Sequence, residues 1–213
     1  MIEVTPHDPS VTHVDVPCHT FWEGKAWNGR RQTDVVTRGG LTFGALDTSP
    51  GAIITRGVLL DVAAARGVDW LAADDFVTSE DLDAAEELAM TRVAPGDAVI
   101  VNVGRSARER ATPSEPLVRA GLRADAMPWL FRRDVAVFAG DCTERFPYPS
   151  VRVPFPLHQI GSVAMGLCLL DGVDPDPLVA ACRENERNEF LLGFSAPRIT
   201  GATGFPVNPF CMF

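Results

Sequence analysis

Residues 11–19 are the segment that most restricts how this chain can fold. They read Val-Thr-His-Val-Asp-Val-Pro-Cys-His, and the side chains of an extended segment point alternately to the two faces of a sheet. One face would then be apolar and suited to the core, with Thr12, Val14, Val16 and Cys18. The other would carry His13, Asp15, Pro17 and His19. Because proline lacks the N–H that pairs strands, we expect the strand to end, or to lie at an edge, at Pro17.

The polar face of this segment offers the ligands of a metal site. Of only four histidines in the chain, His7, His13 and His19 fall near the N-terminus. Imidazoles and a carboxylate on one face suit zinc or manganese, and a catalytic site leaves one position open for water. Such a cation makes hydroxide available near neutral pH, and a spare imidazole can move protons. The same pattern also fits a half-buried strand whose histidines only hydrogen-bond to their neighbours.

Composition excludes several classes of protein. The chain has 213 residues, 46% apolar and 22% charged, which is typical of a soluble globular protein with one domain. No apolar run has the roughly 18 residues that a membrane span needs, and no secretory signal opens the sequence, so we expect a cytoplasmic protein. A net charge of −9 repels phosphate backbones, which argues against nucleic-acid binding. The expected partner is a small-molecule substrate.

Alternation and helical periodicity predict a mixture of strands and helices. A capping box at Thr78–Asp81 predicts a helix over 79–92. The charged stretch 104–116 and the Gly- and Pro-rich stretch 201–209 are predicted to be loops. Further helices are expected at 124–133 and 175–188. Strands are expected at 52–55, 57–62, 98–103, 135–138, 167–170 and 189–194.

The run from Thr12 to His19 resembles the metal-binding signature of the cyclase family typified by bacterial kynurenine formamidase, which also includes isatin hydrolase. Further blocks resemble that family in the same order, at 21–29, 55–61, 95–97, 156–158 and 201–207. The resemblance therefore covers nearly the whole chain. It implies an α/β fold in a single domain, residues 1–213, with a mixed, barrel-like β core flanked by helices. It also implies a homodimer or homotetramer.

The resemblance also implies roles for individual residues. His13 and Asp15 would bind a divalent metal, Zn²⁺ or Mn²⁺, and His19 would be the catalytic acid/base. His158 matches the family's downstream histidine ligand, and Asp171 is the match for the carboxylate that follows it. The aromatic loop adds candidate substrate-binding residues, Phe21, Trp22 and Trp27.

Two departures from the family pattern concern the N-terminus. Pro9 stands where the signature has its first metal-binding histidine, so that ligand is missing unless His7 or Asp8 replaces it. Relatives also carry an additional N-terminal segment that helps to cover the site, and few residues precede the motif here. The chain is therefore interpreted as a divergent member with a shortened N-terminus and an incomplete metal signature.

Three functions remain open on this basis. The first is a metal-dependent hydrolase of a carbon–nitrogen bond in a small amide or lactam, in which metal-bound hydroxide attacks a carbonyl and His19 moves the proton. The second is a biosynthetic cyclase or dehydratase that uses His19 and Asp15 without a complete metal site. The third is a binding or assembly subunit that pairs with an active relative.

Overall fold

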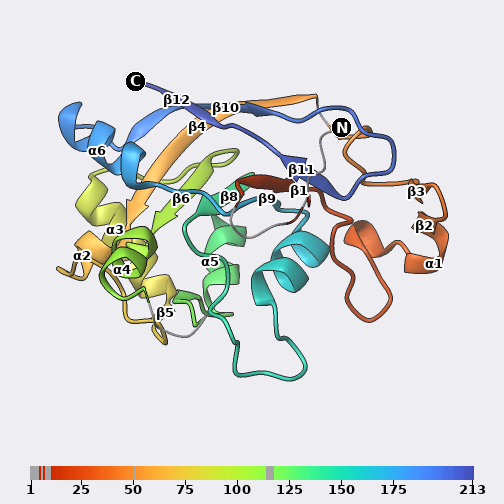
Figure 1. Ribbon diagram of the computed structural model, residues 1–213, viewed down its shortest axis with the longest axis horizontal. Coiled ribbons are helices and arrows are strands. Elements are labelled where there is room, and N and C mark those ends of the chain that lie inside the picture. The colour runs from red at the N-terminus through yellow and green to blue at the C-terminus, as the bar shows by residue number, and fades with distance from the viewer. Residues whose placement is uncertain (1–4, 6, 8–10, 50, 114–117) are drawn as a thin grey trace.

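Figure 1 shows the computed structural model, which describes residues 5, 7, 11–49, 51–113 and 118–213. Its main element is a curled sheet of eight strands in the order β11-β1-β9-β8-β6-β4-β10-β12. The middle strands β4, β6, β8 and β9 run parallel, and the pairs at both sides are antiparallel. The strands are β1 His13–Asp15, β4 Ala52–Asp61, β6 Ala98–Asn102, β8 Val137–Gly140, β9 Cys168–Asp171, β10 Glu189–Ser195, β11 Gly204–Pro206 and β12 Phe210–Met212.

Helices flank this sheet, and two short strand pairs lie outside it (Figure 1). The helices are α1 Gln32–Val35, α2 Val62–Ala65, α3 Ser79–Ala89, α4 Arg105–Ala111, α5 Ala126–Arg132 and α6 Asp176–Glu184, with a 3₁₀ turn at Trp27–Gly29 and a π-helix at Leu157–Met165. The short pairs are β2 Val36–Thr37 with β3 Gly40–Leu41, and β5 Phe76–Val77 with β7 Gly121–Leu122. The predicted α/β class, with a mixed, barrel-like core flanked by helices, is confirmed.

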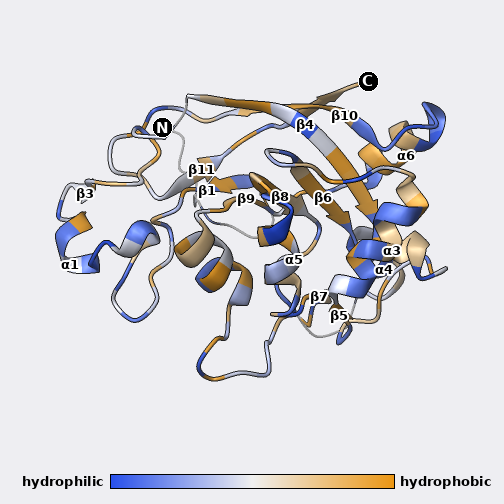
Figure 2. Cartoon of the chain, turned by 180° about the vertical axis from the view of Figure 1, so that it is seen from behind, coloured by the Kyte–Doolittle hydropathy of each residue, from blue (hydrophilic) through white to orange (hydrophobic). Residues whose placement is uncertain are grey.

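The core lies on both faces of the sheet. In β6 the side chains of Val99 and Val101 pack into one apolar cluster, and those of Ala98 and Ile100 pack into the other. Figure 2 shows the resulting continuous hydrophobic colour along β6. A strand buried on both faces has no polar side to alternate, which is why 98–101 is an unbroken apolar run in the sequence. Within the described residues, every helix is too short or too polar to cross a membrane.

Most of the predicted elements are present with shifted ends. The helix predicted at 79–92 is α3, which has the capping box of Thr78 and Asp81 and ends early because Met90 adopts a left-handed backbone. The runs predicted separately at 52–55 and 57–62 form one strand, β4. The prediction of a loop over 201–209 was wrong for residues 204–206, because these form β11, which pairs with β1.

The loop predicted at 104–116 was also wrong, because it contains α4. The Asp141 carboxylate, just beyond β8, holds the N-terminus of this helix. It accepts hydrogen bonds from the backbone N–H of Val103 at 2.8 Å and of Arg105 at 2.7 Å. Burial of Asp141 raises its pKa to about 6, although these hydrogen bonds act in the opposite direction. A partner so distant in the sequence leaves no local signal of the helix.

We therefore expect Asp141→Asn to lower the free energy of unfolding at neutral pH by about 2 kcal/mol. The asparagine amide has a single acceptor oxygen, so one of the two buried N–H groups loses its partner. Denaturant unfolding measures the change, with Asp69→Asn as a control at an exposed aspartate. A loss no larger than that of the control would contradict the assigned role of Asp141.

Candidate metal centre

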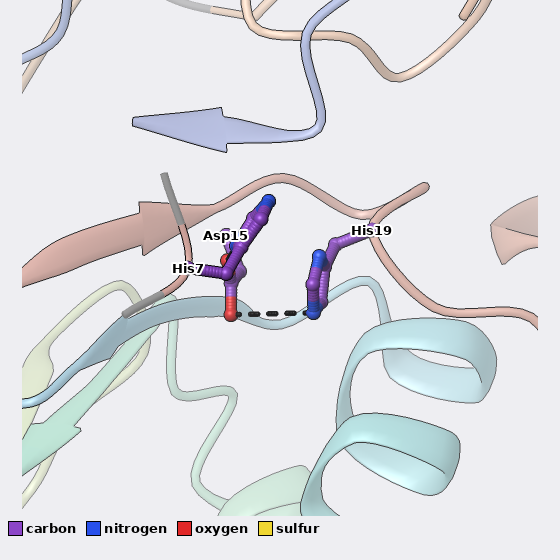
Figure 3. Close-up of side chains that lie close together, drawn as sticks. All are labelled: His7, Asp15 and His19. Carbon is purple, nitrogen blue, oxygen red and sulfur yellow. Dashed lines mark ion pairs between the residues drawn. The ribbon is translucent and has the colours of Figure 1, made fainter. Parts of the chain in front are cut away.

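The carboxylate of Asp15 lies at the centre of four imidazoles. His7 Nδ1 is 2.7 Å from Asp15 Oδ1, and His13 Nε2 is 3.7 Å from the same oxygen. The Nε2 atoms of His19 and His158 are each 3.7 Å from Asp15 Oδ2. Figure 3 shows His7, Asp15 and His19 converging, although they come from different parts of the N-terminal segment. All four histidines of the chain thus meet at one carboxylate.

Asp15 is buried without the hydrogen bonds that a buried carboxylate normally has. It is 1% exposed, and neither oxygen accepts a hydrogen bond from any residue that the structure describes. His7 Nδ1 is likewise buried and unbonded, because its close approach to Asp15 lacks the angle of a hydrogen bond. Leaving such groups unpaired is costly. The Asp15 oxygens and His7 Nδ1 lie close together with no hydrogen bond between them, which is the arrangement that a bound cation requires. These donor atoms therefore fit a divalent metal.

Three of the four histidines are oriented by a contact of their other ring nitrogen. His13 Nδ1 lies 2.8 Å from the carbonyl oxygen of Val11, and His7 Nε2 lies 2.8 Å from Thr203 Oγ1. His158 Nδ1 lies 2.8 Å from Glu144 Oε1. An outer partner that fixes the ring and leaves the inner nitrogen available is the usual arrangement around metal-binding histidines.

The backbone brings these side chains together in two ways. β1 places His13 and Asp15 on one face by strand alternation, as predicted. The strand then ends, and a turn closed by a 2.8 Å hydrogen bond from His19 N to Val16 O carries His19 to the cluster. The strand thus ends two residues before Pro17, where its end or an edge was predicted, and the expected shared face of His13, Asp15, Pro17 and His19 does not extend beyond Asp15. Pro17 lines a separate cavity together with Val14, so it does not share the face of His13.

A glycine makes room for the cluster on the side of β11. Gly204 is the register partner of Asp15. A Cβ atom at this position would lie 2.6 Å from His7 Cε1 and 2.3 Å from the carbonyl oxygen of Val14. Any larger residue would push β11 away from β1, which explains why a glycine in the 201–207 block accompanies the histidine motif.

Burial and the charges of neighbouring side chains shift the pKa values of Asp15, His19 and His158. Burial opposes ionisation of Asp15, but the imidazoles of His158 and His7 outweigh it and hold its pKa well below the usual range. Burial also lowers the pKa of His19 to about 4, despite the nearby Asp15 charge. For His158 the same penalty is overcome by Asp15 and Glu144, which raise its pKa to about 10. The imidazole of His19 is therefore neutral at physiological pH and can accept a proton.

Two groups of donors share Asp15, and in each the donor atoms lie within 4.8 Å of one another. One group is His13, Asp15 and Asp171, and the other is His7, Asp15 and His19. Asp171 reaches the cluster because β9 pairs with β1 in a register that sets Asp171 opposite His13. Either group has the residue types of a zinc or manganese site.

A cavity of about 330 Å³ opens beside the cluster. Its lining includes His19, His158 and Asp171, with Phe146 and Phe155 as aromatic walls. Phe21, Trp22 and Trp27 are not part of this lining. Trp27 lines the cavity behind β1, Phe21 packs against the core, and Trp22 lies under the guanidinium of Arg152.

The structure adds residues that sequence reasoning assigned no firm role. His7 lies against Asp15, with its Nδ1 at 2.7 Å from Asp15 Oδ1, while Asp8 and Pro9 lie outside the described residues. Glu144, shortly after β8, lies 2.8 Å from His158 Nδ1 through its Oε1 atom. Arg119 lines the cavity, and nothing in the sequence pattern around it indicates this.

Comparisons with known proteins identify the family and similar folds. A family model described as "Putative cyclase" matches residues 1–144. Among solved structures, one described as a novel cyclase is 23% identical with a TM-score of 0.83, and the alignment covers 95% of this chain and 69% of that one. Isatin hydrolase A from Labrenzia aggregata is 21% identical with a TM-score of 0.64, covering 94% and 71%. No curated protein matches the chain.

Another similar structure is described as a "Potential Metal-Dependent Hydrolase With Cyclase Activity". It is 14% identical to this chain, with a TM-score of 0.56, and the alignment covers 95% of this chain and 78% of that one. At these identities the structural likenesses establish a shared fold.

Proposed function

Because the chain belongs to the cyclase family, as its family model shows, we propose that it is a metal-dependent hydrolase that cleaves a carbon–nitrogen bond in a small amide or lactam. The observation that carries this proposal is the Asp15 carboxylate, which is buried among four imidazoles and accepts no hydrogen bond from the described residues. The similar structures described as hydrolases support the reaction class. They do not identify the substrate.

Zinc or manganese would be held by His13, Asp15 and Asp171, with His158 directed at the same carboxylate. A divalent metal in this position supplies a Lewis acid that polarises the scissile carbonyl and acidifies water. Glu144 keeps His158 aligned through its Nδ1 hydrogen bond. We further propose that His7, which approaches Asp15 to 2.7 Å, takes the place of the ligand that the motif lacks at Pro9.

His19 would move the proton. It lines the cavity, and burial keeps its imidazole neutral, so its Nε2 can accept a proton from the attacking water. The same atom would then return the proton to the departing nitrogen. Phe146 and Phe155 would bound the substrate and limit the access of bulk water to the reacting carbonyl. The earlier candidates Phe21, Trp22 and Trp27 would affect substrates only from outside this cavity.

Metal analysis combined with an activity panel tests the proposal. After reconstitution we expect about one equivalent or more of zinc or manganese. We also expect hydrolysis of at least one N-formyl aniline, lactam or cyclic amide, lost in chelator and restored by the metal. Less than about a tenth of an equivalent would contradict the proposal. Turnover that persists in chelator would instead favour a cyclase or dehydratase that works without a metal.

A further inference from the structure

Arg119 is a positively charged residue in the lining of the cavity beside the cluster. Its backbone is fixed to that of Phe146 by two hydrogen bonds, Arg119 N to Phe146 O at 2.8 Å and Phe146 N to Arg119 O at 2.9 Å. Both side chains line the cavity. The backbone of Arg119 is therefore tied to that of a residue in an aromatic wall of the pocket, close to the residues proposed for catalysis.

This guanidinium has no carboxylate partner within the described parts of the chain. Its Nε atom is buried without a hydrogen bond. Glu109 and Asp171 act on its charge only from beyond ion-pair distance, and burial together with Arg105 lowers its pKa. Other partly buried arginines are paired, as the contacts of Arg56 with Asp97, Arg105 with Glu109 and Arg133 with Glu86 show. A half-buried cation without an anion is costly unless a ligand supplies one.

The residues around Arg119 indicate which kind of anion would bind to its guanidinium. The guanidinium fork matches a carboxylate, to which it can donate two parallel hydrogen bonds. Asp171 and Glu144 also line the cavity, and Glu144 is balanced by His158. A doubly charged phosphate would be repelled by Asp171 more strongly than a singly charged carboxylate. Phe146 and Phe155 beside the cation favour an aromatic group that bears this carboxylate.

We infer that Arg119 binds a carboxylate on the substrate, and that the substrate is consequently an aryl or cyclic amide with a carboxylate group besides the bond that is cleaved. The term substrate rests on the proposed function, but carboxylate binding by Arg119 does not. Arg119 is then the residue that selects anionic over neutral substrates. It would also orient the scissile carbonyl toward His19 by anchoring the opposite end of the molecule.

A binding measurement on the chelator-treated protein tests the anion site without the metal. Isothermal titration with benzoate and its neutral counterpart benzamide compares the wild type with Arg119→Met. We expect the wild type to prefer benzoate and Arg119→Met to lose at least about tenfold in benzoate affinity. Arg119→Lys should fall between them, because lysine retains the charge without the fork. Arg123→Met is the matched control, since Arg123 is exposed and pairs with Asp125.

Equal benzoate affinity in the wild type and Arg119→Met would overturn the inference, as would no measurable preference of the wild type for benzoate over benzamide. Thermal unfolding of each variant establishes that it is folded.

A second measurement concerns turnover in the metal-loaded enzyme. N-Formyl-2-aminobenzoate and its methyl ester differ in one negative charge. We expect the wild type to prefer the acid at least about tenfold in kcat/KM, and this ratio to approach one in Arg119→Met. A ratio unchanged by the substitution would overturn the inference. If neither compound is hydrolysed, that result counts against the proposed function, while the benzoate titration still decides the role of Arg119.

Discussion

An Asp15→Asn variant is expected to lose most of its zinc and at least about 10³-fold in kcat/KM, the largest effect of any single substitution in this protein. Asp15 is the one residue common to both donor groups and the one that all four imidazoles face. Asparagine keeps its size but removes the charge that draws a cation to the centre of the cluster. Metal content by mass spectrometry and activity of the reconstituted enzyme measure the two losses.

The metal-free protein provides the control for this variant. The imidazoles hold the pKa of Asp15 low, so its charge stabilises the folded state at neutral pH, and the metal-free variant should unfold somewhat more easily than the metal-free wild type. Added zinc should raise the unfolding temperature of the wild type and not that of the variant, because only a bound ligand stabilises the folded state. Asp69→Asn should behave as the wild type. Full zinc binding by Asp15→Asn would refute the assignment of Asp15 as the central ligand.

His19→Gln is expected to lower kcat by about 10² to 10⁴-fold while the metal is retained. Glutamine can hydrogen-bond in the cavity, but it cannot accept and return a proton near neutral pH. KM should change much less than kcat, because the substitution leaves Arg119 and the aromatic walls in place. Single-turnover rates together with metal content separate this effect from loss of the metal.

The neighbouring imidazole of His7 is the matched comparison. Its ring centroid lies 4.2 Å from that of His19, and both residues belong to one donor group. His7→Gln should weaken metal binding by about 10 to 100-fold, as expected for loss of a ligand. If His19→Gln releases zinc to the same degree as His7→Gln, then His19 is a ligand, and another group must carry the proton.

The sequence predicts the part of this centre that depends on local geometry. Strand alternation places His13 and Asp15 together, since residues two apart in a strand share a face. Strand alternation does not account for the position of His19, which depends on a turn after Asp15. It also could not locate His7, which is tethered to Thr203 across 196 positions of the chain.

For the fold, too, the sequence predicts the elements that depend on local signals and misses those that depend on distant residues. The capping box and the apolar run at 98–101 are local signals, and α3 and β6 follow from them. α4 and β11 depend on distant partners, the carboxylate of Asp141 and the edge of β1, so composition alone suggested loops. Glu144 and Arg119 were not assigned for the same reason, because their roles depend on what lies across the cavity.

The position of β1 in the sheet also determines when the site can form during synthesis. β1 is the first strand of the chain, but both of its neighbours, β9 and β11, come from the last third. Until residues through Asp171 have left the ribosome, β1 has no neighbouring strand to pair with, and its second neighbour, β11, follows later still. The nascent chain therefore carries His13 and Asp15 long before the strands that hold them in place exist.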